Sequence, residues 1–428
     1  MNLCERDLQH VWHPYTQMKD AEVIGIERGE GAYLFDINNK KYIDAVSSWW
    51  VNTLGHTNKY IASKISEQLN KLEQVIFAGF THQPAVELAE RLLSILPENQ
   101  KKIFFSDNGS TAVEVALKMS IQYWSNKGIK KNKIIAFRDA YHGDTFGAMS
   151  ASGRSVFTRA FDDFLFDVIF IETPLKGCEE RAFEELKISV FKNEPAAFIF
   201  EPLVLGAGGM LMYEPEILER MIHFCKQHNV ITIADEVMTG FYRTGKLFAT
   251  DYISEKPDIY CMSKGITGGF LPLGVTACNN NIFDAFISDD KTKTLYHGHS
   301  YTANPISCTA ALAALDLYEN KECEENVKRI ENSHQIFFQN ISSHPSVIDI
   351  RQRGTILAIE IKTSDNTGYI NSIRDKAYKY FLEKGIILRP LGNVIYILPP
   401  YCINNSDLEY IYSEIENFLD MHCDQFIK

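Results

Sequence analysis

Two residues at the ends of neighbouring apolar runs have side chains suited to one kind of organic chemistry. Asp235 ends the run VITIAD, and Lys264 follows the run DIYCM. A lysine amine condenses with an aldehyde, and a carboxylate holds a ring nitrogen protonated, so that the ring withdraws electrons from a carbanion. An enzyme that uses pyridoxal 5′-phosphate (PLP) needs this pair. Alone, the lysine could lie in a surface turn and the aspartate could cap a helix, but together they favour the catalytic interpretation.

The turn SDNGST (residues 106–111) could bind the phosphate of such a cofactor. It joins the apolar run KIFF to a segment whose apolar residues recur at helical spacing. Glycine lets the backbone approach a ligand closely, and the N–H groups at a helix start favour an anion. Asn108, Gly109 and Ser110 are therefore candidate phosphate contacts, although a plain capping turn has a similar sequence.

Two other apolar runs end in residues that could face a ligand. Tyr141 follows IIAFRDA, and its ring could stack on a flat cofactor. His142 and Asp144 could bind a metal, but no third ligand has a useful spacing, so no metal site is expected. Glu201 ends AAFIFE, and the glycines after it predict a loop beside the site, because they do not join a strand to a helix as a GxGxxG motif does.

Substrate contacts are suggested by an arginine and two tryptophans near the ends of the chain. Arg389 stands next to a proline in ILRPLG, and arginine grips a carboxylate bidentately. A surface ion pair is the alternative. Trp49 and Trp50 are two of only four tryptophans, and they could wall a pocket for a long apolar substrate or belong to the core.

The middle of the chain predicts an α/β fold. From about residue 100 to 280, short apolar runs alternate with segments of helical periodicity. The runs are apolar on both faces, which favours a large domain with a mainly parallel sheet covered by helices. One helix is expected to begin at Pro215, since proline is favoured in the first turn. The predicted strands are KIFF, IIAF (134–137), VIFI (168–171), AAFIFEP (196–202), VITIA (230–234) and DIYCM (258–262).

The two ends of the chain predict a smaller α+β domain. Residues 22–46 alternate apolar and polar around the turn at Asn38-Asn39, which indicates antiparallel strands. After about residue 310 come a long helical pattern, the strand-like TILAIEIK, a helix (369–384) and the strand-like VIYILPP. We expect residues 1–50 and 311–428 to build the small domain, and residues 51–310 to build the large PLP-binding domain.

Bulk composition excludes some classes of partner. The 428 residues are 45% hydrophobic and carry a net charge of −12, so a surface for nucleic acid or anionic membrane is not expected. The nine cysteines include no CxxC pattern and indicate reduced thiols. No signal-peptide core and no apolar stretch of roughly 18 residues occur, which predicts a cytoplasmic protein.

Several motifs in order resemble the class III (ω-type) PLP-dependent aminotransferases of fold type I. They are SDNGSTAVEVALKM, AYHGDTFGAMS, IFEPLVLGAGGM, IADEVMTGFYRTGKLFA, SKGITGG and HGHSYTANP, and the likeness runs from about residue 10 to 400. Within the family, VWHPYTQM, SSWW, QYW and RPLGNVIYILPPY resemble members that convert 8-amino-7-oxononanoate to 7,8-diaminononanoate in biotin biosynthesis.

This resemblance implies roles for the candidate residues. Lys264 is implied to bond the cofactor covalently and to move the substrate proton, and Asp235 to pair with the ring nitrogen. Ser300 is implied to reach the phosphate of the other subunit's cofactor, so a homodimer is expected. The implied cofactor contacts are Asn108, Gly109, Ser110, Tyr141, Asp235, Lys264, His299 and Ser300. The implied substrate contacts are Tyr15, Trp49, Trp50, Tyr141, Lys264, Gly298 and Arg389, with Arg389 on the carboxylate of the oxo-acid; Arg243 and Asp144 are weaker candidates for handling the donor.

The resemblance leaves the amino donor open. Asn108 stands where family members often have serine, which matters little if the backbone makes the contact. Members that use S-adenosylmethionine often have HGPTFMGNP where this chain has HGHSYTANP, and the version with His299-Ser300-Tyr301 resembles members that use lysine. SSWW and GFYRTGK favour S-adenosylmethionine. We therefore expect S-adenosylmethionine as the amino donor and keep lysine as the alternative.

Other functions compete with this interpretation. Another class III aminotransferase acting on ornithine, 4-aminobutyrate or a similar amine is one, and a PLP aminomutase is a second; Tyr15 and the tryptophan pair argue against both by resemblance. A non-catalytic binding module on the same fold is opposed by the intact Lys264, Asp235 and phosphate turn. A nucleotide-binding protein would need GxxxxGK[ST] or a well-placed GxGxxG, which the sequence lacks.

Overall fold

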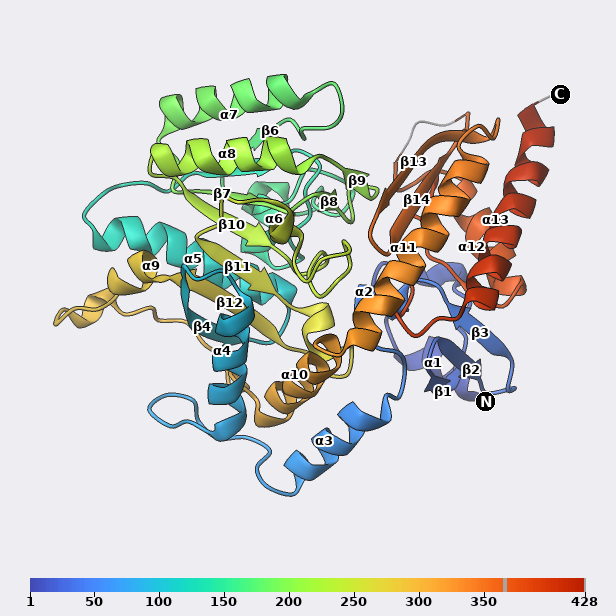
Figure 1. Cartoon of the computed structure of the whole chain (residues 1–428), viewed down its shortest axis with the longest axis horizontal. Coiled ribbons are helices and arrows are strands. Elements are labelled where there is room, and N and C mark those ends of the chain that lie inside the picture. Colours follow the sequence, from blue (N-terminus) through green and yellow to red (C-terminus); the bar gives the residue numbers. More distant parts are fainter. Residues whose placement is uncertain (365–367, 427–428) are drawn as a thin grey trace.

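A seven-stranded sheet forms the middle of the molecule (Figure 1). The computed structural model describes residues 1–364 and 368–426 of the chain. All strands of this sheet run parallel except β12, which is antiparallel to both neighbours. The predicted α/β class with a mainly parallel sheet is therefore confirmed. In spatial order the strands are β4 (Gln100–Ser106), β12 (Gly274–Asn279), β11 (Ile259–Met262), β10 (Ile231–Asp235), β7 (Ala197–Phe200), β5 (Ile134–Phe137) and β6 (Val168–Ile171).

Helices bury both faces of this sheet. Ile134 and Ala136 belong to one hydrophobic core, whereas the alternate residues Ile135 and Phe137 belong to the other, so every position of the strand is apolar. The first core is closed by α5 (Gly109–Asn126), α6 (Phe146–Ala151) and α9 (Asn280–Asp284). The second is closed by α4 (Gln83–Ile95), α7 (Glu179–Asn193), α8 (Pro215–Gln227) and α10 (Pro305–Tyr318).

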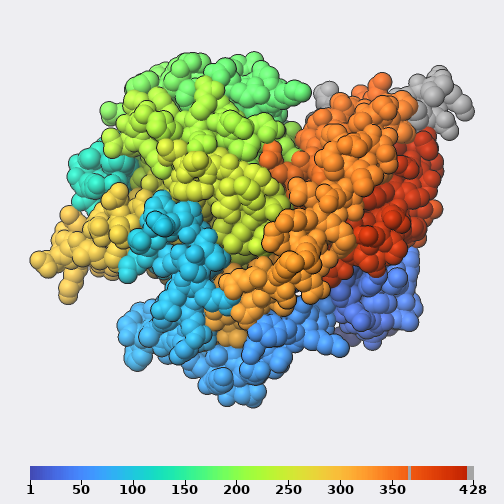
Figure 2. All heavy atoms as spheres, in the orientation of Figure 1, coloured from blue at the N-terminus to red at the C-terminus, as the bar shows by residue number. Residues whose placement is uncertain are grey.

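Both ends of the chain meet in a second sheet. The antiparallel strands β1 (Ile26–Glu30), β2 (Tyr33–Asp36) and β3 (Lys41–Asp44) are joined by β15 (Ile386–Ile387), which runs parallel to β3. Figures 1 and 2 show the first residues of the chain packed beside its last helices. This pairing agrees with a smaller unit built from both ends, while the domain limits at residues 50 and 310 stay predictions.

The remaining elements complete this arrangement. A three-stranded antiparallel sheet contains β13 (Val347–Arg353), β14 (Ile356–Ile361) and β16 (Val394–Ile397), and a short hairpin contains β8 (Val204–Leu205) and β9 (Leu211–Met212). The other helices are α1 (Leu3–His10), α2 (Ser47–Trp50), α3 (Lys59–Leu69), α11 (Lys321–Ile341), α12 (Ile373–Glu383) and α13 (Asn405–Phe426). Short 3-10 turns are η1 (Met18–Asp20), η2 (Asp162–Phe164), η3 (Ala249–Tyr252), η4 (Lys264–Thr267) and η5 (Lys291–Lys293).

Some elements differ from the expectation. β12 and β13 were not predicted, and the helical pattern expected after residue 310 is two helices, of which α10 already begins at Pro305. Among the helices of the described ranges, none has the length and apolar character needed to cross a membrane. The eight cysteines whose side chains the structure describes are free thiols.

Candidate active site

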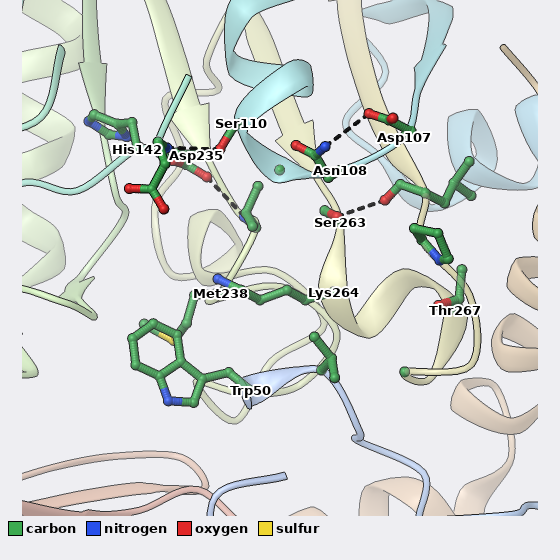
Figure 3. Close-up of a pocket in the computed structure, with 18 of the residues that line it drawn as sticks. Trp50, Asp107, Asn108, Ser110, His142, Asp235, Met238, Ser263, Lys264 and Thr267 are labelled. Carbon is green, nitrogen blue, oxygen red and sulfur yellow. Dashed lines mark hydrogen bonds and ion pairs between the residues drawn. The ribbon is translucent and has the colours of Figure 1, made fainter. Parts of the chain in front are cut away.

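The carboxyl ends of β10 and β11 place the two central candidates in one cavity. Asp235 is the last residue of β10, and it pairs in register with Cys261 of the neighbouring β11. Lys264 follows two residues after the end of β11 and opens η4 with a left-handed φ of 47°. Both line a cavity of about 690 Å³. Figure 3 shows Lys264 between Trp50 on one side and Asp235 with the start of α5 on the other.

The carboxylate of Asp235 is held by hydrogen bonds to both of its oxygens. His142 Nδ1 lies 2.7 Å from Oδ2, and the backbone N–H of Val237 donates to Oδ1 at 3.1 Å. The His142 backbone N–H in turn donates to the Ser152 hydroxyl at 2.8 Å. Asp235 is only 4% exposed, so this buried anion is oriented before any ligand binds. His142, weighed from sequence only as a metal ligand, instead orients the carboxylate.

Burial lowers the pKa of the Lys264 amine below its usual value. The Asp235 carboxylate, and Glu201 in its ionised form, act in the opposite direction, and Arg243 adds to the lowering. The lysine nitrogen lies 4.9 Å from the centre of the Trp50 ring. A lowered pKa increases the fraction of neutral amine, which is the form that attacks a carbonyl.

The first turn of α5 lines the same cavity. Asn108 caps this helix, because its side chain accepts from the Thr111 backbone N–H at 3.0 Å. A helix start leaves its first N–H groups without intrahelical partners, and the helix dipole favours an anion there. A Cβ at Gly109 would lie 2.6 Å from a methyl group of Val237, so only glycine lets this turn approach the end of β10 so closely. Asn108, Gly109 and Ser110 thus line the cavity opposite Lys264.

Glu201 is a buried carboxyl group beside these residues, and its chemical importance was not predicted from sequence. It accepts from the backbone N–H groups of Tyr141 and Gly206, each at 2.9 Å. Burial raises the pKa of Glu201 to about 7, and the Asp235 charge adds to the increase while His142 opposes it. The signal that could have identified it is its position at the end of a parallel strand, which Glu201 shares with Asp235.

A smaller apolar slot of about 340 Å³ opens from the Lys264 cavity. The two share Trp50, Val51, Tyr141, Asp144 and Lys264. The Arg389 guanidinium lies 4.7 Å above the Trp49 ring in this slot, so a cation and an apolar wall occur together. The slot is lined by Tyr15, Trp49, Trp50, Val51, Tyr141, Asp144, Phe157, Ala207, Lys264, Tyr369, Arg389, Leu391 and Tyr396.

Tyr15 fastens the N-terminal segment to the slot. Its hydroxyl donates to the Asp144 carboxylate and lies 3.1 Å from the Tyr141 hydroxyl. Its ring meets the edge of Trp49 at 5.3 Å between centroids. Burial and the bond to Asp144 raise the pKa of Tyr15, and burial raises that of Tyr141, so both phenols stay protonated near neutral pH.

Other predicted residues lie apart from these two cavities. Gly298, His299 and Ser300 are not among the residues that line either one, and the Ser300 carbonyl accepts from the Gln74 side chain at 2.9 Å. Arg243, a weaker candidate for the donor, is 1% exposed and donates to the carbonyls of Pro399 and Trp50 behind the slot. Within one chain, the Lys264 cavity and the apolar slot are therefore adjacent, whereas residues 298–300 lie apart from both.

Comparisons with known proteins show the family of this chain. The model of the class III aminotransferase family matches residues 15–419. The adenosylmethionine-8-amino-7-oxononanoate aminotransferase of Synechococcus elongatus is 44% identical over 420 residues, which cover 96% of this chain and 98% of that protein. The crystal structure of the Methanocaldococcus jannaschii protein of the same name is 37% identical with a TM-score of 0.92, covering 97% of this chain and 98% of that one. An omega transaminase from Pseudomonas jessenii in complex with PMP is 28% identical with a TM-score of 0.92 and 98% coverage of both chains.

Proposed function

Because this chain belongs to the class III aminotransferases, we propose that it transfers an amino group to 8-amino-7-oxononanoate and so makes 7,8-diaminononanoate for biotin biosynthesis. The family match spans most of the chain, which confirms the predicted family, the predicted enzyme class and PLP as its cofactor. The aromatic slot is the observation that supports this substrate: it begins at Lys264 and contains Arg389 over Trp49. A long apolar acid fits a slot with one cation.

The cavity around Lys264 fits PLP. We assign the covalent link to the Lys264 amine, the ring nitrogen to Asp235, the phosphate to the turn at Asn108, Gly109 and Ser110, and one ring face to Tyr141. When bound, the cofactor supplies an electron sink for a carbanion. Lys264 removes and returns the proton at the reacting carbon, and the His142 bond keeps the Asp235 carboxylate aimed into the cavity.

The slot is assigned to the acceptor. Arg389 binds the carboxylate of the oxo-acid through two parallel hydrogen bonds, and Trp49 with Trp50 covers its alkyl chain. Tyr15 and Tyr141 form the wall near Asp144. Flat aromatic walls suit the alkyl chain of the acceptor, because they exclude water without demanding one pattern of hydrogen bonds.

S-adenosylmethionine is the proposed amino donor, because the names of the relatives include adenosylmethionine. Lysine is the second candidate, because His299-Ser300-Tyr301 departs from the sequence of the members that use S-adenosylmethionine. A homodimer in the cytoplasm is also proposed: in the described chain the exposed Ser300 lies apart from the Lys264 cavity, which suits contacts by His299 and Ser300 to a partner's cofactor and by Gly298 to a pocket edge.

A direct assay tests this function. The purified PLP-loaded protein is given 8-amino-7-oxononanoate with S-adenosylmethionine or with lysine, and 7,8-diaminononanoate is measured by mass spectrometry. We expect product with S-adenosylmethionine. If product forms with lysine and not with S-adenosylmethionine, lysine is the amino donor and the proposed acceptor stands. Absence of product with both, together with amination of another oxo-acid, would reject the proposed acceptor.

A further inference from the structure

The tryptophan loop, residues Ser47–Trp50 of the short α2, has an unfavourable backbone with non-helical angles at Ser48 and Trp49. Ser47, Ser48 and Trp50 have φ angles of 52°, 58° and 66°, and none is glycine. Each such residue is strained, and this conformation persists only where surrounding contacts impose it. Trp49 and Trp50 form the wall of the slot, so the contacts that impose this backbone also set the shape of the slot.

Asp44, at the end of β3, makes such contacts. Its side chain is fully buried. Its Oδ2 accepts from the Ser48 backbone N–H at 2.7 Å, and its Oδ1 accepts from the Val46 N–H at 3.2 Å. The carboxylate therefore bonds directly to the residue that precedes Trp49 and has a positive φ.

His56 holds Asp44 from the other side. Its Nε2–H donates to Asp44 Oδ2 at 2.8 Å, and its Nδ1 accepts from the Asn52 side-chain amide at 2.8 Å. These two bonds fix the ring orientation and the tautomer. The backbone of His56 exchanges hydrogen bonds of 2.7 and 3.0 Å with Gly31, so the imidazole is anchored to the turn between β1 and β2.

The same network reaches the lysine side of the site. A Cβ at Gly269, which lines the Lys264 cavity, would lie 2.8 Å from the Asn52 Cα, so these two backbones are in contact. Trp50 is fixed further by its indole N–H, which donates to the Tyr396 hydroxyl at 3.0 Å. The loop is thus held between β3 and the segment after Lys264.

We propose that Asp44 and His56 are positioning residues that hold the tryptophan loop and thereby set the affinity of the slot for its long apolar acceptor. This inference rests on the proposed function for its substrate. Neither side chain lines the Lys264 cavity or the slot, so they act through Ser48 and the tryptophans. Loss of the pair weakens acceptor binding and leaves the donor half-reaction intact.

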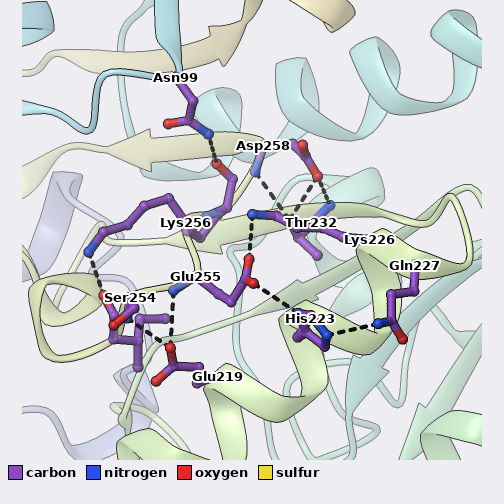
Figure 4. A network of polar contacts seen from close by, with 12 residues as sticks. Asn99, Glu219, His223, Lys226, Gln227, Thr232, Ser254, Glu255, Lys256 and Asp258 are labelled. Carbon is purple, nitrogen blue, oxygen red and sulfur yellow. Dashed lines mark hydrogen bonds and ion pairs between the residues drawn. The ribbon is translucent and has the colours of Figure 1, made fainter.

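Three variants and a control test this inference. His56→Phe keeps a ring but removes the donor to Asp44, His56→Gln keeps an N–H donor, and Asn52→Ala removes the bond to Nδ1. His223→Phe is the matched control, because His223 pairs with Glu255 at 2.9 Å in a surface network away from the cavity (Figure 4). Each half-reaction of the PLP-loaded enzyme is measured alone, and near-ultraviolet circular dichroism reports tryptophan packing without substrate.

We expect His56→Phe to raise the KM for the oxo-acid roughly tenfold, which corresponds to about 1.4 kcal/mol. kcat and the donor half-reaction should stay within about twofold, His56→Gln should recover most of the loss, and His223→Phe should behave as wild type. Should His56→Phe fail to fold, a KM increase of several-fold in Asn52→Ala supports the inference.

Certain results would overturn it. An unchanged KM for the oxo-acid in His56→Phe would overturn the inference. If His56→Phe does not fold, an unchanged KM in Asn52→Ala would overturn it. Equal losses in both half-reactions would also overturn it. If the wild type does not aminate the oxo-acid, the proposed function fails by itself. The tryptophan signal then decides: its loss in His56→Phe and return in His56→Gln supports the positioning role, and an unchanged signal rejects it.

Discussion

The two ends of the central sheet use their polar side chains differently. At the amino ends of β10 and β11, Asp258 accepts from the Thr232 backbone N–H at 2.9 Å and from its hydroxyl at 2.8 Å (Figure 4). The Asn279 side chain also donates to Asp258, at 2.8 Å. At the carboxyl ends, Asp235 and Lys264 instead line a cavity of about 690 Å³ (Figure 3). The carboxylate at one end is satisfied by neighbouring polar groups, whereas Asp235 and Lys264 at the other end face space for a ligand.

Two lysines differ in what their amines contact. Burial lowers the pKa of both Lys256 and Lys264. Lys256 donates to the carbonyls of Thr250 and Ile253, at 2.8 and 2.5 Å, and so completes the end of a turn. Lys264 reaches into the cavity under Trp50. A lowered pKa alone would not separate the two, and the position of the amine relative to the cavity does.

The largest expected effect comes from exchanging these lysines for alanine one at a time. Lys264→Ala should abolish turnover and the visible absorbance of the covalently held cofactor, because no other amine replaces it. Lys256→Ala should keep turnover within about twofold and lower the free energy of unfolding by about 1–2 kcal/mol. Steady-state rates and absorption spectra measure both. Normal turnover in Lys264→Ala would reject the assignment.

The two aspartates extend the comparison. Asp235→Asn should lower turnover on the order of 10²–10³-fold, because the amide cannot supply the charge that faces the cofactor ring. Asp258→Asn should leave turnover unchanged and lower the free energy of unfolding by about 1–3 kcal/mol, since it disturbs only structural hydrogen bonds. Turnover and urea unfolding are measured for each. A greater loss of turnover in Asp258→Asn would contradict the functional division of the sheet.

The central strands could be predicted because two apolar faces leave a plain signal. β12 (Gly274–Asn279) escaped prediction, since it follows a glycine-rich segment and its antiparallel place between β4 and β11 depends on contacts distant in sequence. β13 (Val347–Arg353) escaped because it pairs only with β14 in its sheet and carries charged residues that are partly exposed.

Within the site, the residues at strand ends could be predicted from the sequence, but the side chains that hydrogen-bond to them could not. Asp235 and Lys264 follow apolar runs, so their shared edge could be inferred. The bond from His142 to Asp235 joins residues 93 apart in sequence, and that from Tyr141 to Glu201 joins residues 60 apart. Spacing along one chain does not encode such contacts. Phe157 lies in a segment without a regular pattern, and Tyr369 was expected at the start of a helix that in fact begins at Ile373. The two rings nevertheless pack against each other in the slot, with 4.7 Å between their centroids.

Arginines provide the next comparison. Arg389→Ala should raise the KM for the oxo-acid roughly 10–100-fold and leave the donor half-reaction within about twofold, because a charge-assisted bond to one substrate is lost. Arg220, which pairs with Glu180 on the surface, is the control, and Arg220→Ala should change neither. Half-reactions measured in single turnovers separate the two substrates. Equal losses in both halves of Arg389→Ala would indicate a structural role.

The smallest expected effect concerns the proton on Glu201. Burial raises the pKa of this carboxyl from 4.5 to about 7, so between these values the folded protein holds a proton that the unfolded chain has lost. The free energy of unfolding therefore falls as pH rises through about 7. Glu201→Gln cannot titrate, so its urea stability should fall less between about pH 5.5 and about pH 8, by about 1–3 kcal/mol.

Glu255 in the surface network should change the free energy of unfolding with pH in the opposite direction. Hydrogen bonds from His223 and Lys226 lower its pKa, so its contribution is present above the pKa of the unfolded chain and is lost as pH falls through the folded pKa. Glu255→Gln should therefore remove stability at neutral pH and not at acid pH. If Glu201→Gln and wild type had the same pH dependence, Glu201 would be charged in the folded protein, and the cavity would carry a second buried anion beside Asp235 instead of a neutral acid.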